Sequence, residues 1–367
     1  MKSGFFSFIA TVININGYTM KWLLASFFCF ITLAGIAQEI PKGNWQISGY
    51  IETYYTYDFN QPEDHLRPDF LFNFKRHNEF SVNLAFVRAQ YTDEKVRGNL
   101  ALMAGNYAQY NLAEEPAWAQ MVYEASVGVK IIDKLWLDVG VMPSHIGFES
   151  AEGMETWHLS RSLLAENSPY FLTGGRLSYA WNEKFDITLW LTNGWQRVQR
   201  IERNQSMGIG LGLNHRPIEG LEINYSNYFG NEYPQTLYLP RFFNNFYTMY
   251  SFQDWGITVG ADHGLEGTIH DDINQWYAFT ISLRRKIMER VHLAARADHY
   301  SDVKGVILPR GMEVTGYSMN MDYQVSEKAL ARIEFRQFTS PEPIFDLPGA
   351  KFSKGNYAIN TSLAIRF

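Results

Sequence analysis

Apolar and polar residues alternate with a period of two along most of the chain after Gln38, in segments of roughly ten residues. The last segment is the most regular, with Tyr357, Ile359, Leu363, Ile365 and Phe367 alternating with Ala358, Asn360, Ser362, Ala364 and Arg366. Since side chains alternate between the two faces of a strand, such a segment predicts a β-strand with one apolar and one polar face. Segments of about ten residues have the length of tilted strands that cross a membrane.

The same alternation predicts further strands around residues 45–58, 135–141, 185–191, 207–213, 221–225, 277–283 and 333–335. A water-soluble β-sandwich has the same period, but it holds its aromatic residues in the core, in the middle of its strands. Here the aromatic residues fall near the strand ends, at Trp45, Tyr55, Tyr57, Tyr179, Trp181, Phe185, Trp195, Phe229, Tyr323 and Phe367. A membrane barrel places its aromatic rings at these positions, level with the lipid headgroups.

The connections between the strands fall into two alternating classes, as short periplasmic turns and long extracellular loops do. The short ones are 92–96, 132–134, 182–184, 215–220, 285–290 and 325–328. The long ones are 59–77, 108–119, 143–170, 231–240, 263–274 and 339–355, and the segments 197–204 and 301–311, of intermediate length, fall on the long side of the alternation.

Strand directions counted from both chain ends agree only if two strands lie between the segments 220–230 and 274–284. Residues 241–250 and 255–262, with a turn near Gln253 and Asp254, supply them. We therefore predict an all-β fold, a transmembrane antiparallel up-and-down β-barrel of 16 strands, with 14 as the alternative count. A barrel of this width leaves an aqueous channel.

The amino terminus has the pattern of a secretory signal peptide. Lys21 precedes an apolar stretch from Trp22 to Leu33, and the small residues Gly35 and Ala37 follow. We expect translation to start at Met20, cleavage after Ala37, and residues 38–367 to form the barrel in a Gram-negative outer membrane. The alternative is a membrane anchor at 20–37, although its apolar part is short for a bilayer, which needs about 20 residues.

Composition narrows the class further. The 367 residues are 16% aromatic and carry a formal charge of -6, with no basic run that would suggest a nucleic-acid partner. Cys29 is the single cysteine, so an internal disulfide is excluded. We expect no cofactor.

Charged residues at the polar positions are unevenly distributed along the chain. Acidic residues occur on the early strands and arginines on the late ones, with Asp298 and Glu334 among the arginines: Glu52, Glu124, Asp138 and Asp186 against Arg284, Arg296, Arg332, Arg336 and Arg366. As pore-lining residues they would form opposed walls with a transverse field that orients polar solutes and favours small ions. Alternatively, the arginines are hydrated and paired with carboxylates.

The longest connection, residues 143–170, contains many apolar residues and a helix-compatible run after Gly153. We expect it to fold into the lumen and to narrow the channel, with Glu149, Glu152, Glu155, His158 and Arg161 at the constriction. The alternative is an external loop packed on the rim. The spacings of His145 with Glu149 and of Glu155 with His158 are too weak a signal for a metal site.

The chain resembles a known family, the OmpL-like β-barrel porins common in Bacteroidetes outer membranes. The matching stretches are GYIETYYTYDFNQP at 49–62, KRHNEFSVNLAFV at 75–87, EPAWAQMVYEASVGVK at 115–130, VGVMPSHIGFESA at 139–151, SRSLLAENSPY at 160–170, NGWQR at 193–197 and RFFNNFY at 241–247. The resemblance implies an outer-membrane porin without a cofactor and names no substrate.

We expect a porin-like channel for passive diffusion of small polar solutes or ions. The alternatives are a structural or adhesive barrel with a blocked lumen, a transporter for hydrophobic substrates, and a barrel enzyme using Ser144 with His145 or His158 with Ser160 and Ser162. About seven residues between Gln38 and the first strand leave no room for a plug domain. The expected partners are outer-membrane lipid, small solutes, two further copies in a homotrimer, and the barrel-assembly machinery, which would recognise the last strand ending in Phe367.

Overall fold

The computed structural model describes residues 43–270 and 272–367. The expected start at Met20, the signal peptide and its cleavage after Ala37 lie outside the described residues.

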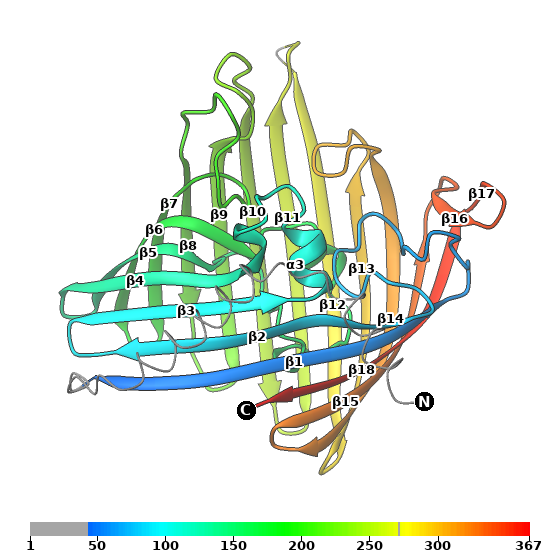
Figure 1. Cartoon of the computed structure of the whole chain (residues 1–367), viewed down its shortest axis with the longest axis horizontal. Coiled ribbons are helices and arrows are strands. Elements are labelled where there is room, and N and C mark those ends of the chain that lie inside the picture. The colour runs from blue at the N-terminus through cyan, green and yellow to red at the C-terminus, as the bar shows by residue number, and fades with distance from the viewer. Residues whose placement is uncertain (1–42, 271) are drawn as a thin grey trace, which may run out of the picture. The chain divides into compact units, whose positions relative to one another are not determined.

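Sixteen antiparallel strands form one closed barrel, in which each strand pairs with its neighbours in the chain (Figure 1). The barrel strands are β1 (Asn44–Asp58), β2 (Phe80–Thr92), β3 (Val96–Ala104), β4 (Val122–Ile132), β5 (Leu135–Pro143), β6 (Phe171–Asn182), β7 (Phe185–Thr192), β8 (Gly208–His215), β9 (Leu221–Asn231), β10 (Pro240–Phe252), β11 (Trp255–Gly267), β12 (Ile273–Met288), β13 (Val291–Asp302), β14 (Met312–Ser326), β15 (Ala329–Thr339) and β18 (Gly355–Arg366). The predicted count of 16 is confirmed, and β10 and β11 occupy the two inferred segments.

The barrel closes where the first strand pairs with the last. Tyr50 of β1 lies opposite Arg366 of β18, and the pairing continues to Asp58 opposite Ala358. Closure leaves no strand edge unpaired, which matters because an unpaired backbone amide in hydrocarbon costs several kcal/mol. The alternation of the sequence gives the barrel an apolar outer face, and the closure of the sheet pairs its backbone amides, so both make it compatible with hydrocarbon.

The short and long connections alternate as predicted, with short turns such as 253–254 at one end of the barrel. The expected loop 263–274 is shorter than predicted, because β11 and β12 stay paired as far as Gly267 and Ile273. A further difference is the small hairpin of β16 (Phe345–Leu347) and β17 (Lys351–Ser353) within the last long loop.

Apolar residues occupy the outward-facing positions, and the polar residues face inward together with a set of aromatic ones. On β12, Ile281 is 51% exposed on the outer surface, whereas the adjacent Thr280 is 3% exposed inside the barrel. The same contrast holds on β7 between Leu189 and Trp190. An outer surface of exposed Ile, Leu, Val and Phe side chains is unfavourable in water and favourable against lipid.

Aromatic side chains fill part of the interior at the end of the barrel that carries the long loops. The inward-facing Tyr228, Phe243 and Trp276 are fully buried and pack with Phe70 of the first long loop and Phe345 of β16. This cluster spans strands β9 to β15, so that side of the barrel has an apolar core instead of open space.

In the described residues, four short helices lie in the long connections: α3 (Asn106–Asn111), η1 (Ala119–Met121), η2 (Gly153–Glu155) and α4 (Leu163–Glu166). None of the helices in the described residues is long and apolar enough to cross a membrane.

Candidate functional site: the interior of the barrel

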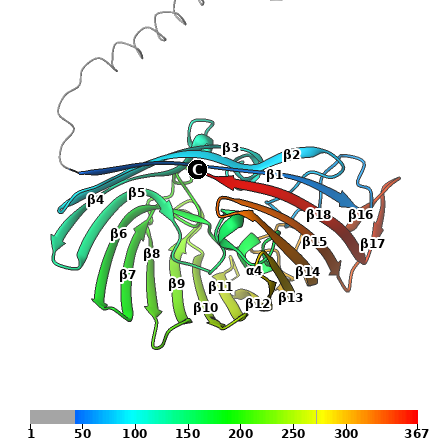
Figure 2. The same ribbon diagram turned by 90° about the horizontal axis from the view of Figure 1, so that it is seen from below.

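Residues 144–170, called the inner segment below, leave the barrel wall at the end of β5 and return at β6. Between these points they cross the interior, and Figure 2 shows α4 inside the ring of strands. Hydrogen bonds tie the segment to five residues of the wall, through one backbone carbonyl group and four inward-facing side chains: His145 Nε2 to Asn227 O (2.9 Å), Gly147 N to Asn245 Oδ1 (3.1 Å), Leu159 N to Asn320 Oδ1 (3.0 Å), Ser160 N to Glu334 Oε2 (2.9 Å) and Leu163 N to Asp298 Oδ2 (3.2 Å).

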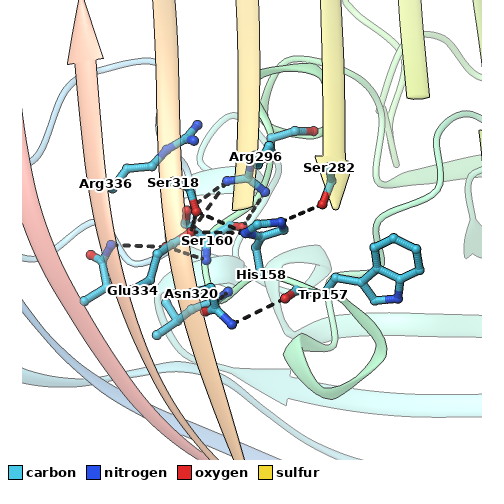
Figure 3. Close-up of polar contacts among 12 residues, drawn as sticks. Trp157, His158, Ser160, Ser282, Arg296, Ser318, Asn320, Glu334 and Arg336 are labelled. Atoms are coloured by element: carbon cyan, nitrogen blue, oxygen red, sulfur yellow. Dashed lines mark hydrogen bonds and ion pairs between the residues drawn. The ribbon is translucent and has the colours of Figure 1, made fainter. Parts of the chain in front are cut away.

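His158 lies at the centre of this attachment (Figure 3). Its Nε2 atom is 2.7 Å from Ser282 Oγ and its Nδ1 atom is 3.0 Å from Ser318 Oγ, while Glu334 Oε1 accepts a hydrogen bond from Ser318 at 2.5 Å. All four side chains are buried. The arrangement satisfies both ring nitrogens of the histidine, as buried polar groups require.

Arginines of the wall bind backbone carbonyl groups of the inner segment. Arg332 donates to Gly153 O and Thr156 O, each at 2.6 Å, and its Nε pairs with Asp322 at 2.8 Å. Arg296 donates to the carbonyl oxygens of Ser160 and Arg161, each at 3.0 Å, and it pairs with Glu149 at 3.2 Å. Both arginines therefore hold the segment in place.

The constriction candidates differ in exposure. Arg161 is fully buried and donates to Ser150 O (2.6 Å), Leu159 O (2.8 Å) and Ala151 O (2.9 Å), while Glu149 accepts from Ser162 N at 2.8 Å. His158 is buried as described above. Glu152 and Glu155 meet solvent, with Glu152 2.8 Å from Arg88 and Glu155 2.6 Å from Arg366.

Most of the charges expected to form an acidic and a basic wall are paired with opposite charges close by, as in the alternative drawn from the sequence. On the late strands Arg336 pairs with Asp298 at 2.7 Å, and Asp322 lies 3.7 Å from Arg284. Glu334 is also in this network, 3.7 Å from Arg296. Adjacent opposite charges partly cancel each other's field, so this pairing weakens any field across the lumen.

The early wall also contains three inward-facing arginines that were not among the expected pore-lining residues: Arg88, Arg97 and Arg176. Arg88 pairs with Glu124 at 3.0 Å, and both Arg97 and Arg176 pair with Asp138. Glu52 is buried and accepts from Asn83 at 3.2 Å. The signal was available, because these arginines occupy the polar positions of their alternating strands.

A cavity with a volume of ≈ 270 Å³ lies beside the inner segment. Both ends of the inner segment line it, together with Tyr107, Tyr123 and Glu124. A second, much smaller space of ≈ 30 Å³ lies beside His158, Ser282 and Arg296. Within the described residues no group of three or more His, Cys, Asp or Glu side chains is arranged to hold a metal ion.

A closed antiparallel barrel of 16 strands with an apolar outer face and a charged interior belongs to the class of porin-type outer-membrane barrels. The chain belongs to the family described as "Putative beta-barrel porin-2, OmpL-like", whose model matches residues 44–367. This confirms the family resemblance drawn from the sequence stretches.

Solved structures of outer-membrane proteins share the fold at low sequence identity. The anion-selective porin from Comamonas acidovorans is similar with a TM-score of 0.60 and 8% identity over 89% of this chain and 100% of that chain. The outer membrane channel DcaP of Acinetobacter baumannii has a TM-score of 0.60 and 8% identity over 89% of this chain and 97% of that chain. The trimer form of OmpT of Vibrio cholerae has a TM-score of 0.57 and 10% identity over 89% of this chain and 99% of that chain. Among curated proteins no relative matches the chain.

Proposed function

We propose that this protein is a passive outer-membrane channel for small polar solutes or ions, and that solutes pass between the inner segment and the wall formed by β2 to β8. The observation that carries the proposal is the unequal filling of the interior. Inward-facing residues of β9 to β15 are mostly buried under the inner segment and the aromatic cluster, whereas Arg88, Arg97, Ser126, Arg176 and Ser178 on the other wall keep partial exposure. Half-exposed polar groups inside a barrel border water.

Conductance in planar bilayers tests the channel itself. Stepwise current on insertion of the purified protein supports it, and silence across many insertions favours a structural or adhesive barrel with a blocked lumen. The aromatic cluster at the long-loop end is the feature that would close such a barrel.

The proposed route is tested by cysteine labelling, because the single native cysteine, Cys29, lies upstream of the expected processing site. In Ser178→Cys, on the half-exposed face of β6, a charged thiol reagent should reduce the current. The matched variant Ser362→Cys places the thiol at a buried inward position of β18 and should be unaffected. Equal responses of the two variants would contradict the route.

We assign no catalytic role to His158 and its serine partners. The pair of His158 and Ser282 is part of what a hydrolase site contains. However, both side chains are buried, and the adjoining space of ≈ 30 Å³ is close to that of a single water molecule. A substrate therefore has no place beside the serine, and anchoring accounts for these contacts.

The remaining proposals concern export and assembly. We infer a Gram-negative outer-membrane location after cleavage near Ala37, contact with lipid, and a homotrimer as in the trimer form of OmpT. We also infer recognition of the last strand by the barrel-assembly machinery. Phe367 closes the barrel through paired backbone hydrogen bonds with Gly49 at 2.8 and 3.0 Å, while its ring is exposed. Phe367→Ala should lower the yield of assembled barrel in cells, with Phe352→Ala, also an exposed ring, as the control.

A further inference from the structure

We propose that inward-facing residues of β3, β5 and β6 form a binding site for small oxyanions, of the carboxylate or phosphate class, built on Arg97, Asp138 and Arg176. This deepens the proposed function, on which it rests, because it names the class of solute that the half-exposed wall attracts.

The residues form one lateral row across neighbouring strands. Arg97 lies opposite Gly128, Gly128 opposite Asp138, Asp138 opposite Arg176, and Arg176 opposite Trp190. Directly opposed residues on adjacent strands have their Cβ atoms about 5 Å apart and share one face of the sheet. The barrel register therefore fixes two arginines on either side of a single carboxylate.

The positive charge of this row faces the lumen and the negative charge lies beneath it. Arg97 Nη2 is 2.5 Å from Asp138 Oδ2, and Arg176 Nη2 is 3.1 Å from the same oxygen. The Asp138 side chain is 4% exposed, against 34% for Arg97 and 27% for Arg176. Two guanidinium groups share one carboxylate, so the row carries a net charge of +1 and presents mainly guanidinium to a solute.

Both arginines retain donors for a ligand. Each uses its Nε and Nη2 groups on Asp138. Their Nη1 groups make no hydrogen bond to any residue in 43–270 or 272–367. A guanidinium with a free edge binds the oxygens of carboxylates and phosphates more specifically than an ammonium group does.

Aromatic rings hold the two guanidinium groups in position. Arg97 Cζ lies 4.3 Å from the ring centre of Trp136, and Arg176 Cζ lies 5.4 Å from that of Trp190. Lys130 Nζ, 5.5 Å from Trp136, adds a further cation on the same wall. Stacked arginines lose less conformational freedom on binding, which favours a pre-formed site.

Gly128 makes the row possible. A Cβ atom at this position would lie 2.3 Å from Asp138 Oδ1 and 2.9 Å from Arg97 Cγ, so a side chain would separate the pair. Arg88, on β2 of the same wall, differs from Arg97 and Arg176 because it pairs with two carboxylates, Glu124 and Glu152. The local excess of positive charge is thus confined to the row around Asp138.

The test measures binding to the full chain in detergent micelles by titration calorimetry, with inorganic phosphate and with acetate. Replacing both arginines alone would leave Asp138 buried and unpaired. The triple variant therefore combines Arg97→Gln and Arg176→Gln with Asp138→Asn, and its net charge differs from that of the wild type by one. Arg285→Gln on the outer surface makes the same charge change and serves as the control. Circular dichroism verifies the β-fold of each variant, and the conservative pair Arg97→Lys with Arg176→Lys replaces the triple variant if that does not fold.

We expect the wild type and Arg285→Gln to bind at least one of the two anions, and the triple variant to bind it at least tenfold more weakly. The lysine pair, which lacks the guanidinium fork, should also bind more weakly than the wild type. Tighter binding of phosphate than acetate would identify the phosphate class, and the reverse order the carboxylate class. Undiminished binding by the variant, or no binding by the wild type, would overturn the site.

Reversal potentials in a KCl gradient separate this inference from the channel itself. Anion preference in the wild type that is reduced in the triple variant supports the site. Conductance with a preference for cations would contradict the anion site and support the channel. Anion binding without conductance would contradict the channel and support the anion site.

Discussion

Glu334 on β15 accepts a hydrogen bond at 2.9 Å from the backbone nitrogen of Ser160, a residue 174 positions earlier in the chain. The carboxylate is fully buried and also accepts from Ser318. This contact connects the late wall of the barrel to the inner segment, and the stability of the interior depends on contacts of this kind.

Glu334→Gln should destabilise the barrel. The amide adds a donor where Ser160 N, Ser318 Oγ and Asn360 Nδ2 already donate. It also leaves Arg296 with less compensating charge. Removing one partner of a buried charged network costs about 3–5 kcal/mol. The midpoint of urea unfolding in micelles, followed by tryptophan fluorescence, measures the loss. Glu327→Gln, in the exposed turn between β14 and β15, makes the same charge change and should leave the midpoint unaltered.

Replacing residues 150–164 with a short Gly-Ser linker should raise single-channel conductance several-fold. These residues include η2, His158 and the start of α4, which bind the walls from β12 to β15. Their removal would open that side of the interior to water. Conductance equal to that of the wild type would show that the inner segment does not limit the current.

Glu166 should make the stability of the protein depend on pH. Burial raises the pKa of this carboxyl group to about 7, even though the backbone nitrogens of Phe72 and Asn73 donate to it. Because the folded pKa lies above the unfolded value of about 4.5, the folded state binds more protons between these values. The free energy of unfolding should therefore fall by up to about 3 kcal/mol as the pH rises from 4.5 to 7.

The variant Glu166→Gln cannot ionise and should lose that pH dependence. Urea midpoints measured at several pH values for both proteins provide the comparison. A fall of the same size in the variant would assign it to other groups.

Ile281→Lys should destabilise the barrel in a bilayer, because the side chain is 51% exposed on the outer face near the middle of β12. A lysine near the bilayer midplane costs about 2–4 kcal/mol, falling toward zero near the headgroups. Ile287→Lys, nearer the end of the same strand, provides the comparison. Equal losses at the two positions would contradict the assignment of this face to lipid.

The sequence alone could not show whether Arg332 and Arg336 control ion selectivity or stabilise the fold, which bears on the expected effect of charge reversal at these positions. Their place late in the chain and on the polar face suggested control of ion selectivity. Both side chains are buried, with Arg332 on carbonyl groups of the inner segment and Arg336 on Asp298. Substitutions there should therefore act on folding, and selectivity is better tested at Arg97 and Arg176.

The alternation of apolar and polar positions by itself indicated most of the strands, their two faces and the order of short and long connections. Strand directions counted from both chain ends then favoured 16 strands over 14. These properties are local or follow directly from the strict period of the chain, because a strand has only two faces and every strand reverses direction. The tertiary structure alone decided which charges meet. Arg97, Asp138 and Arg176 come together through the register of neighbouring strands, and Ser160 meets Glu334 through the path of the inner segment. Such contacts depend on three-dimensional distances that no periodicity encodes.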